Sequence, residues 1–226
     1  MRFSFVSLFP NLLKGYFSES ILKRAIEDKK IYIDFYNPRD YTKDKHRRVD
    51  ATIIGGGAGM LMTAQPLMDT LKEIKKDSSD AYVIVLSPVA KTFTQNDAKR
   101  LANKRHIVLV SGRYEGIDER VIEEEVDELF SIGDFILTGG ELASMAVCDA
   151  ISRNVVDVLG NSDSLSMESF EDSLLEAPAF TKPKNYEDNE VISEFLKGNH
   201  SKITDLKRRL ALCKTKYFRP DLYKKV

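Results

Sequence analysis

The chain has 226 residues, of which 42% are hydrophobic and 31% are charged, and its net charge is −1. This length fits one large domain or a medium domain plus a small one, with enough apolar residues for a core. No stretch approaches the roughly 20 apolar residues of a membrane helix. Two distant cysteines and three scattered histidines exclude a disulfide framework and a zinc site, which favours the reducing cytoplasm.

The charge is unevenly distributed along the chain. Residues 197–226 contain ten basic residues against two acidic ones, Asp205 and Asp221, which gives a local charge of +8. Residues 1–196 therefore carry −9. A basic end on a nearly neutral chain suits a polyanion such as a nucleic acid, and equally a solvated helix face.

Strands and helices alternate through the first two thirds of the sequence. Apolar runs predict strands at 3–9, 31–36, 81–86, 106–110 and 132–137. Helical patterns follow at 66–76, at 95–105 after Thr94 as N-cap, and at 141–155. This alternation predicts an α/β domain with a mainly parallel sheet.

The alternation stops near Gly160. Residues 160–173 are polar and rich in serine, which indicates a mobile linker. We therefore expect an α/β domain over 1–159, a linker over 160–173, and a small helical, basic domain over 174–226.

Glycines cluster directly after predicted strands, in GGGAGM (55–60), SGRYEGIDERV (111–121) and SIGDFILTGGE (131–141). In parallel α/β sheets the ligand lies at the carboxyl ends of the strands, where these loops fall. The dinucleotide fingerprint fails because Met60 takes the place of its last glycine, and no phosphate-loop Gly-Lys-Ser/Thr triplet occurs. Ordinary tight turns are the competing interpretation.

An ordered set of motifs resembles the bacterial tRNA (guanine-N(1))-methyltransferase family nearly from end to end. The motifs are SLFP (7–10), NPRDYTKDKHRRVD (37–50), GGGAGMLM (55–62), LSP (86–88), SGRYEGIDERV, SIGDFILTGGEL (131–142), LLEAPAFTKP (174–183), GNH (198–200) and RPDL (219–222). The family belongs to the knotted RNA methyltransferases that use S-adenosylmethionine. The resemblance thus implies a deep trefoil knot in the first domain, a homodimer whose active site is shared between subunits, tRNA as substrate, and a role for magnesium.

The resemblance also implies a cofactor site at the glycine-rich strand ends. Glu115 would neighbour the cationic methionine part of the cofactor. The residues expected to bind S-adenosylmethionine are Leu86, Ser87, Pro88, Gly112, Tyr114, Glu115, Gly116, Ile132, Gly133, Asp134, Phe135, Ile136, Leu137, Gly139 and Gly140.

Methylation at guanine N(1) needs a base, because that nitrogen carries a proton. The family position is an aspartate in the linker, and Glu168 matches it here, so the carboxylate is one methylene longer. Asp163 and Asp172 are the alternative linker acids. Arg153 matches the family arginine that stabilises negative charge on the guanine oxygen; a helix-end arginine is the plainer interpretation.

The basic C-terminal domain is expected to contact RNA phosphates through Lys207, Arg208, Arg209 and Lys214, with Tyr217 and Phe218 in its core. Two other functions stay open: a related enzyme that methylates a ribose 2′-hydroxyl, and a non-catalytic RNA-binding protein. A nicotinamide-dependent oxidoreductase is disfavoured by the failed fingerprint.

Overall fold

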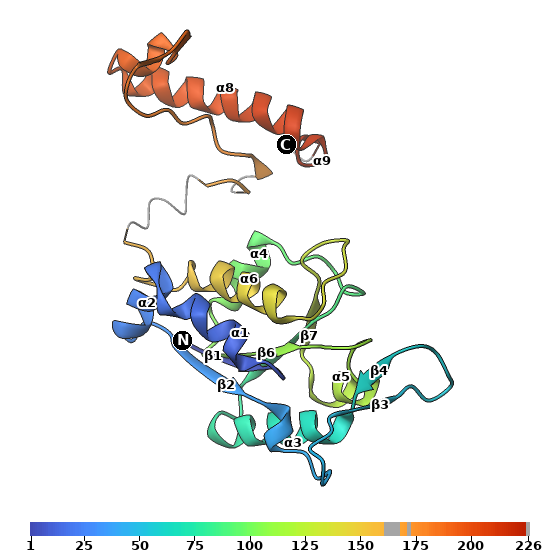
Figure 1. Ribbon diagram of the computed structural model, residues 1–226. Helices are drawn as coiled ribbons and strands as arrows, with labels where there is room; N and C mark the ends of the chain where they lie inside the picture. The colour runs from blue at the N-terminus through green and yellow to red at the C-terminus, as the bar shows by residue number, and fades with distance from the viewer. Residues whose placement is uncertain (161–167, 171–172, 225–226) are drawn as a thin grey trace. The chain divides into compact units, whose positions relative to one another are not determined.

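The computed structural model describes residues 1–160, 168–170 and 173–224. The chain divides into two compact units, Met1–Gly160 and Asn161–Val226 (Figure 1). No helix among the described residues is long and apolar enough to cross a membrane.

A five-stranded parallel sheet forms the centre of the first unit. Its strands are β1 (Arg2–Val6), β2 (Tyr32–Tyr36), β5 (Tyr82–Leu86), β6 (His106–Ser111) and β7 (Glu128–Phe130), in the order β2-β1-β6-β5-β7. Every pair in this sheet is parallel, which confirms the expected mixed α/β fold with a mainly parallel sheet.

Helices cover both faces of this sheet (Figure 1). One face carries α1 (Pro10–Lys14), α2 (Ser20–Glu27), α4 (Gln95–Leu101) and α6 (Glu141–Ser152), and the other carries α3 (Ala64–Asp77) and α5 (Glu119–Glu125). Short 3-10 helices η1 (Gly15–Ser18) and η2 (Pro38–Asp40) and the hairpin of β3 (Asp50–Thr52) and β4 (Met60–Met62) complete the unit.

The sheet has one apolar core on each face, and the central strand β6 contributes to both. Its residues Ile107 and Leu109 join the apolar cluster on the α6 side, whereas Val108 and Val110 join the cluster on the α3 side. All four side chains are fully buried. Because successive side chains of a strand point to opposite faces, a continuous apolar run is what a sheet covered on both faces requires.

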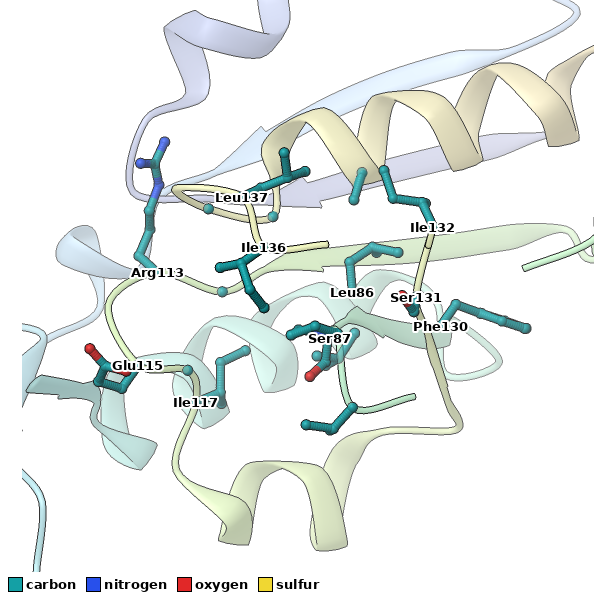
Figure 2. A pocket seen from close by; sticks show the side chains of 18 of the residues that line it. Leu86, Ser87, Arg113, Glu115, Ile117, Phe130, Ser131, Ile132, Ile136 and Leu137 are labelled. Atoms are coloured by element: carbon teal, nitrogen blue, oxygen red, sulfur yellow. The ribbon is translucent and has the colours of Figure 1, made fainter. Parts of the chain in front are cut away.

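The predicted strand at 132–137 is wrong. The last strand of the sheet is β7, and residues 131–137 leave it as an irregular loop. The run IGDFIL has the composition of a strand, but Phe135 is 52% and Ile136 80% exposed in this chain. Leu86 and Phe130, at the ends of β5 and β7, are paired neighbours (Figure 2).

The second unit consists mainly of the long helix α8 (His200–Phe218), which begins at the N-cap Asn199. The other elements are β8 (Asn185–Tyr186), β9 (Asn189–Glu190), η4 (Ser193–Leu196) and α9 (Pro220–Tyr223). The small β8–β9 hairpin was not expected from the sequence. Tyr217 and Phe218 are 80% and 63% exposed, so their assignment to the core is wrong.

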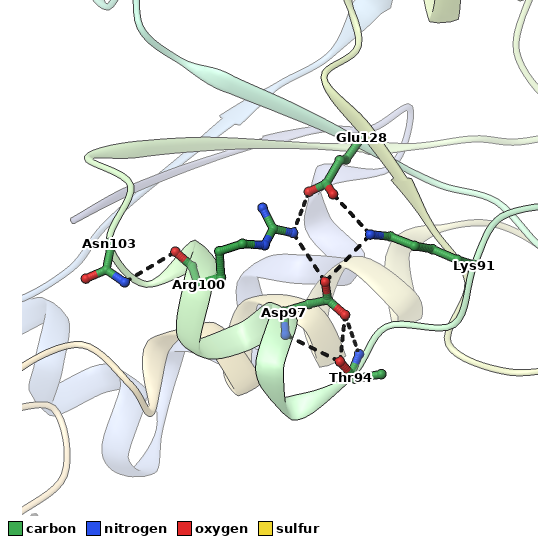
Figure 3. A network of polar contacts seen from close by, with 6 residues as sticks. All are labelled: Lys91, Thr94, Asp97, Arg100, Asn103 and Glu128. Carbon is green, nitrogen blue, oxygen red and sulfur yellow. Dashed lines mark hydrogen bonds and ion pairs between the residues drawn. The ribbon is translucent and has the colours of Figure 1, made fainter.

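A network of charged groups ties the β5–α4 connection to β7 (Figure 3). The carboxylate of Glu128 accepts from Lys91 at 3.2 Å and from Arg100 at 2.7 Å. Asp97 contacts both cations and forms a capping box with Thr94 at the start of α4. Although burial raises the pKa of Glu128, hydrogen bonds from Arg100 and Lys91 outweigh it and hold that pKa below its ordinary value of 4.5.

This network predicts a pH-dependent stability. Glu128→Gln should lower the free energy of unfolding at pH 7 by about 1 kcal/mol, the size of a well-placed, partly exposed ion pair. A carboxyl whose pKa is lower in the folded state stabilises the fold above its unfolded pKa, and this contribution disappears as the pH falls through the folded pKa. The difference between variant and wild type should therefore shrink below pH 4.5.

Urea unfolding at pH values between 7 and 3 measures this difference. The matched control is Glu73→Gln, which removes an exposed pair with Lys76 on α3 and should change stability little at any pH. A Glu128→Gln difference that is equally large at pH 3 and pH 7 would contradict the electrostatic explanation.

Candidate cofactor pocket

A pocket of about 260 Å³ opens where β5, β6 and β7 end together. Leu86 is paired with Ser111 of β6 on one side and with Phe130 of β7 on the other. One residue further, the amide of Ser87 donates to the carbonyl oxygen of Phe130 at 2.9 Å. The loops that leave these three strand ends therefore surround one space, as expected for a ligand site in a parallel sheet.

The structure brings fourteen of the fifteen residues predicted to bind the cofactor around this pocket (Figure 2). They are Leu86, Ser87, Pro88, Gly112, Tyr114, Glu115, Gly116, Ile132, Gly133, Phe135, Ile136, Leu137, Gly139 and Gly140. Asp134 is the exception, and it is exposed and does not line the pocket. Arg113 also lines it, inside the segment 112–116 that was expected at the site. The lining residues that were missed are Val85, Val89, Ile117, Ile122, Phe130, Ser131 and Ala143.

The pocket offers apolar side chains from the strand ends and main-chain groups from the loops. Leu86, Phe130 and Ile132 lie on one side of the pocket, and Ile136 reaches in from the opposite loop (Figure 2). Such a lining suits a flat heterocycle whose edge is read by main-chain N–H and C=O groups. Phe130 escaped prediction because the last strand was placed after it instead of ending at it.

The loop 112–116 holds its shape through the β3–β4 hairpin. The amide of Glu115 donates to the carbonyl oxygen of Met60 at 2.9 Å, and the amide of Met62 donates to that of Gly116 at 3.0 Å. Tyr114 has φ +59°, a left-handed conformation that is uncommon for a bulky residue and frequent at ligand sites. The side chain of Glu115 lies over Gly59, where a Cβ atom would come within 2.5 Å of it.

Arg153 lies at the other end of α6 from the pocket. It is the C-cap residue of this helix, whose N-cap Gly140 lines the pocket. Twelve helical residues span about 18 Å, so the backbone of Arg153 and the pocket-lining Gly140 of the same chain are separated by about the length of α6. The hydroxyl of Tyr16 donates to Asp149 one turn before Arg153, and this hydrogen bond raises the pKa of Tyr16 to about 12.

The one cysteine of the first unit offers no nucleophile to this pocket. Cys148 is fully buried within α6, and burial raises the pKa of its thiol well above the ordinary value. Cys213 lies in α8 of the second unit. Because thiolates are the reactive form of cysteine, the buried Cys148 is not poised as a nucleophile.

Glu168 lies in the second unit, where it is half-buried and lines a groove of about 940 Å³. The groove runs between α8 and the segment 174–184, which is fixed to α8 by a hydrogen bond from the Leu175 amide to Thr215. Lys182, Lys184 and His200 also line it. The alternative acids Asp163 and Asp172 lie outside the described residues.

The four basic residues predicted to bind RNA all lie on α8 but do not share one face. Lys207 and Arg208 line the groove, and Lys214 is seven residues from Lys207, on nearly the same side of the helix. Arg209 is rotated by about 200° from Lys207 and pairs with Asp205 at 3.2 Å. In residues 1–160, 168–170 and 173–224, no group of three or more His, Cys, Asp or Glu side chains could hold a metal ion.

Comparison with known proteins identifies the family. The family model for tRNA (Guanine-1)-methyltransferase TrmD matches residues 1–225. A tRNA (guanine-N(1)-)-methyltransferase of Sulfurovum sp. (strain NBC37-1) is 78% identical over 225 residues, which cover 100% of this chain and 99% of the relative. Enzymes with the same name from Campylobacter curvus and Sulfurimonas denitrificans are each 61% identical, over 100% and 98% of this chain and 96% of each relative. The chain therefore belongs to the tRNA (guanine-1)-methyltransferase family, TrmD.

Proposed function

We propose that this protein transfers a methyl group from S-adenosylmethionine to N(1) of the guanosine immediately 3′ of the anticodon in tRNA. The observation that carries the proposal is the match over the full chain to a family of this name, together with the pocket at the strand ends. In this reading, residues 1–159 bind the cofactor, residues 160–173 carry the base, and residues 174–226 bind tRNA.

The pocket supports S-adenosylmethionine as the methyl donor. The apolar side chains of Leu86, Ile132 and Ile136 suit the adenine ring, and main-chain groups of the glycine-rich loops suit its polar edge. Glu115 supplies a carboxylate on the rim opposite Leu86 and Ile132 (Figure 2), where it would face the cationic methionine part. The fourteen lining residues, and Asp134 beside them, form the proposed cofactor site.

The reaction balances as one displacement. The N(1) proton of guanine passes to the Glu168 carboxylate, and the nitrogen lone pair attacks the methyl carbon as its bond to sulfur breaks. The products are 1-methylguanosine in tRNA and S-adenosylhomocysteine. Negative charge that develops on the guanine carbonyl oxygen is stabilised by the guanidinium of Arg153, which is charged at all relevant pH values.

A homodimer with a shared site accounts for the position of Arg153. Within one chain, α6 separates the backbone of Arg153 from the N-cap Gly140 at the pocket by about 18 Å, which supports a second copy as the source of this group. The linker acid Glu168 would reach the pocket of the partner in the same way. We also propose that the first unit carries the trefoil knot of its family.

The second unit is the proposed tRNA-binding part. Lys207, Arg208, Arg209 and Lys214 give α8 a strongly basic surface that suits phosphate groups. The target base must leave its stack to enter a pocket. We assign no residues to magnesium, because the described residues bring together no group of metal ligands, and no step of the proposed reaction passes through a metal ion.

Methyl transfer from labelled S-adenosylmethionine to tRNA transcripts tests the function. A transcript with guanosine immediately 3′ of the anticodon should be labelled, and a matched transcript with adenosine there should not. Digestion to nucleosides should recover the label as 1-methylguanosine. Recovery as a ribose-methylated nucleoside would favour the 2′-hydroxyl enzyme. Absence of label in a protein that binds both cofactor and tRNA would favour the non-catalytic RNA-binding protein.

The base is tested by Glu168→Ala. Turnover should fall by about 10² to 10⁴, the usual contribution of a general base, whereas the Kd for tRNA should change by less than about twofold. Glu168→Asp should retain most of the activity, because it keeps a carboxylate. The control Asp188→Ala removes an exposed acid from the turn of the β8–β9 hairpin and should leave turnover unchanged. Full turnover in Glu168→Ala would remove this residue from the mechanism.

The shared site is tested by pairing two inactive variants. Glu168→Ala removes the base, and Gly140→Ala places a Cβ atom 2.8 Å from the backbone of Ser111 and so deforms the pocket. In a purified heterodimer of the two variants, the chain with Glu168→Ala keeps an intact pocket and the chain with Gly140→Ala keeps an intact base. If the site is shared, these two parts form one complete site, and about half of the wild-type activity should return. If each chain forms its own complete site, the heterodimer stays inactive.

A further inference from the structure

A buried carboxylate stands where α6 begins. Glu141 is the first residue of this helix and is only 3% exposed. A carboxylate removed from water is stable only when charged or polar groups surround it. Its Oε1 atom accepts from the Ser7 hydroxyl at 2.7 Å and from Nε of Arg113 at 3.1 Å, and its Oε2 atom lies 2.9 Å from Nη2 of Arg113.

The third nitrogen of the Arg113 guanidinium, Nη1, contacts the turn 138–140 at the pocket. Nη1 donates to the carbonyl oxygen of Thr138 at 3.1 Å. The residue after it, Gly139, leaves room for this side chain, since a Cβ atom there would lie 2.4 Å from Nε of Arg113. The guanidinium also lies 4.7 Å from the ring centre of Phe9. In Figure 2 the side chains of Arg113 and Glu115 point in different directions, although they are two residues apart.

These contacts join the side chains of three sequence motifs that are far apart along the chain. Ser7 and Phe9 belong to SLFP after β1, Arg113 belongs to the loop after β6, and Glu141 closes the loop that follows β7. The turn 138–140 lies between two of these contacts. Its Gly140 amide donates to the carbonyl oxygen of Gly112 at 2.9 Å, which brings it against the loop on the other side of the pocket.

We propose that Arg113, Glu141 and Ser7 are positioning residues that fix the turn 138–140 in the shape the pocket needs for its ligand. Arginine is required because its planar fork spans Glu141 and Thr138 at once, whereas a lysine has a single charged atom. The identity of the ligand as S-adenosylmethionine rests on the proposed function. The positioning itself rests on the contacts of these three side chains.

Three variants and one control test this role in the full-length protein. Arg113→Lys keeps the charge and loses the fork, and Glu141→Gln keeps the hydrogen bond to Ser7 and loses the charge. The double variant Arg113→Met with Glu141→Gln leaves no unpaired buried charge, and Arg113→Met alone is made as its reference for stability. The control Arg2→Lys changes an arginine–aspartate pair at the opposite end of β1.

Two readouts separate positioning from general stability. The KM for S-adenosylmethionine should rise about tenfold or more in all three variants, as expected when a site is slightly misplaced, while the KM for tRNA stays within about twofold. Amide hydrogen exchange of residues 138–142 should become faster in the absence of any ligand. The control should change neither readout.

The double variant distinguishes the two explanations most sharply. Removing both charges should restore the melting temperature that Arg113→Met alone loses, because no buried charge then lacks a partner. If the residues position the turn, the KM stays high and exchange stays fast despite the recovered stability. If KM and exchange recover together with the melting temperature, the role is structural only and the inference is overturned. If the wild type does not bind S-adenosylmethionine, the proposed function fails, and the exchange of residues 138–142 still decides the inference.

Discussion

The amide of Ser87 donates to the carbonyl oxygen of Phe130, and this bond carries the parallel pairing of β5 and β7 one residue beyond the end of β5. With β6 paired on the other side of β5, three strands end at the same level and release three loops around one space. Everything proposed for the pocket depends on this common end. A shift of one residue in one strand would turn its side chains to the other face and remove one wall of the pocket.

Where the sequence has one dominant local pattern, the structure follows it. The apolar runs of β5 and β6 could be predicted because a strand covered on both faces has no polar side to interrupt it. The start of α4 could be predicted because Thr94 can satisfy a free amide of the first turn, which it does for Asp97. The location of the pocket was also accessible, since glycine-rich loops after parallel strands gather at one edge of the sheet, whereas its individual residues came from the resemblance to the family.

The errors of the sequence-based predictions have a common physical cause. A local pattern of residues does not show which distant residues will pack against it. The apolar residues after Ser131 line the pocket instead of filling a core. Their composition is nevertheless that of a buried strand, which is why a strand was predicted there. Glu141 has the sequence context of an ordinary acid in the first turn of a helix, which is usually solvated. Only the approach of Ser7, 134 positions earlier, and of Arg113 makes it a buried group. The face of α8 that Arg209 occupies likewise depends on where the segment 174–184 packs.

Helix α6 connects the two halves of the proposed chemistry. Its first residue is held in the buried cluster at the pocket, and its last turn precedes Arg153. Because a packed helix is rigid along its axis, the backbone of Arg153 stays about the length of α6 away from the backbone of Gly140. This separation agrees with the proposed homodimer, in which α6 would fix the pocket at one end and offer its arginine to the partner at the other. Because the helix after the turn 138–140 is rigid, a small movement of this turn would change the shape of the pocket rather than the shape of the helix.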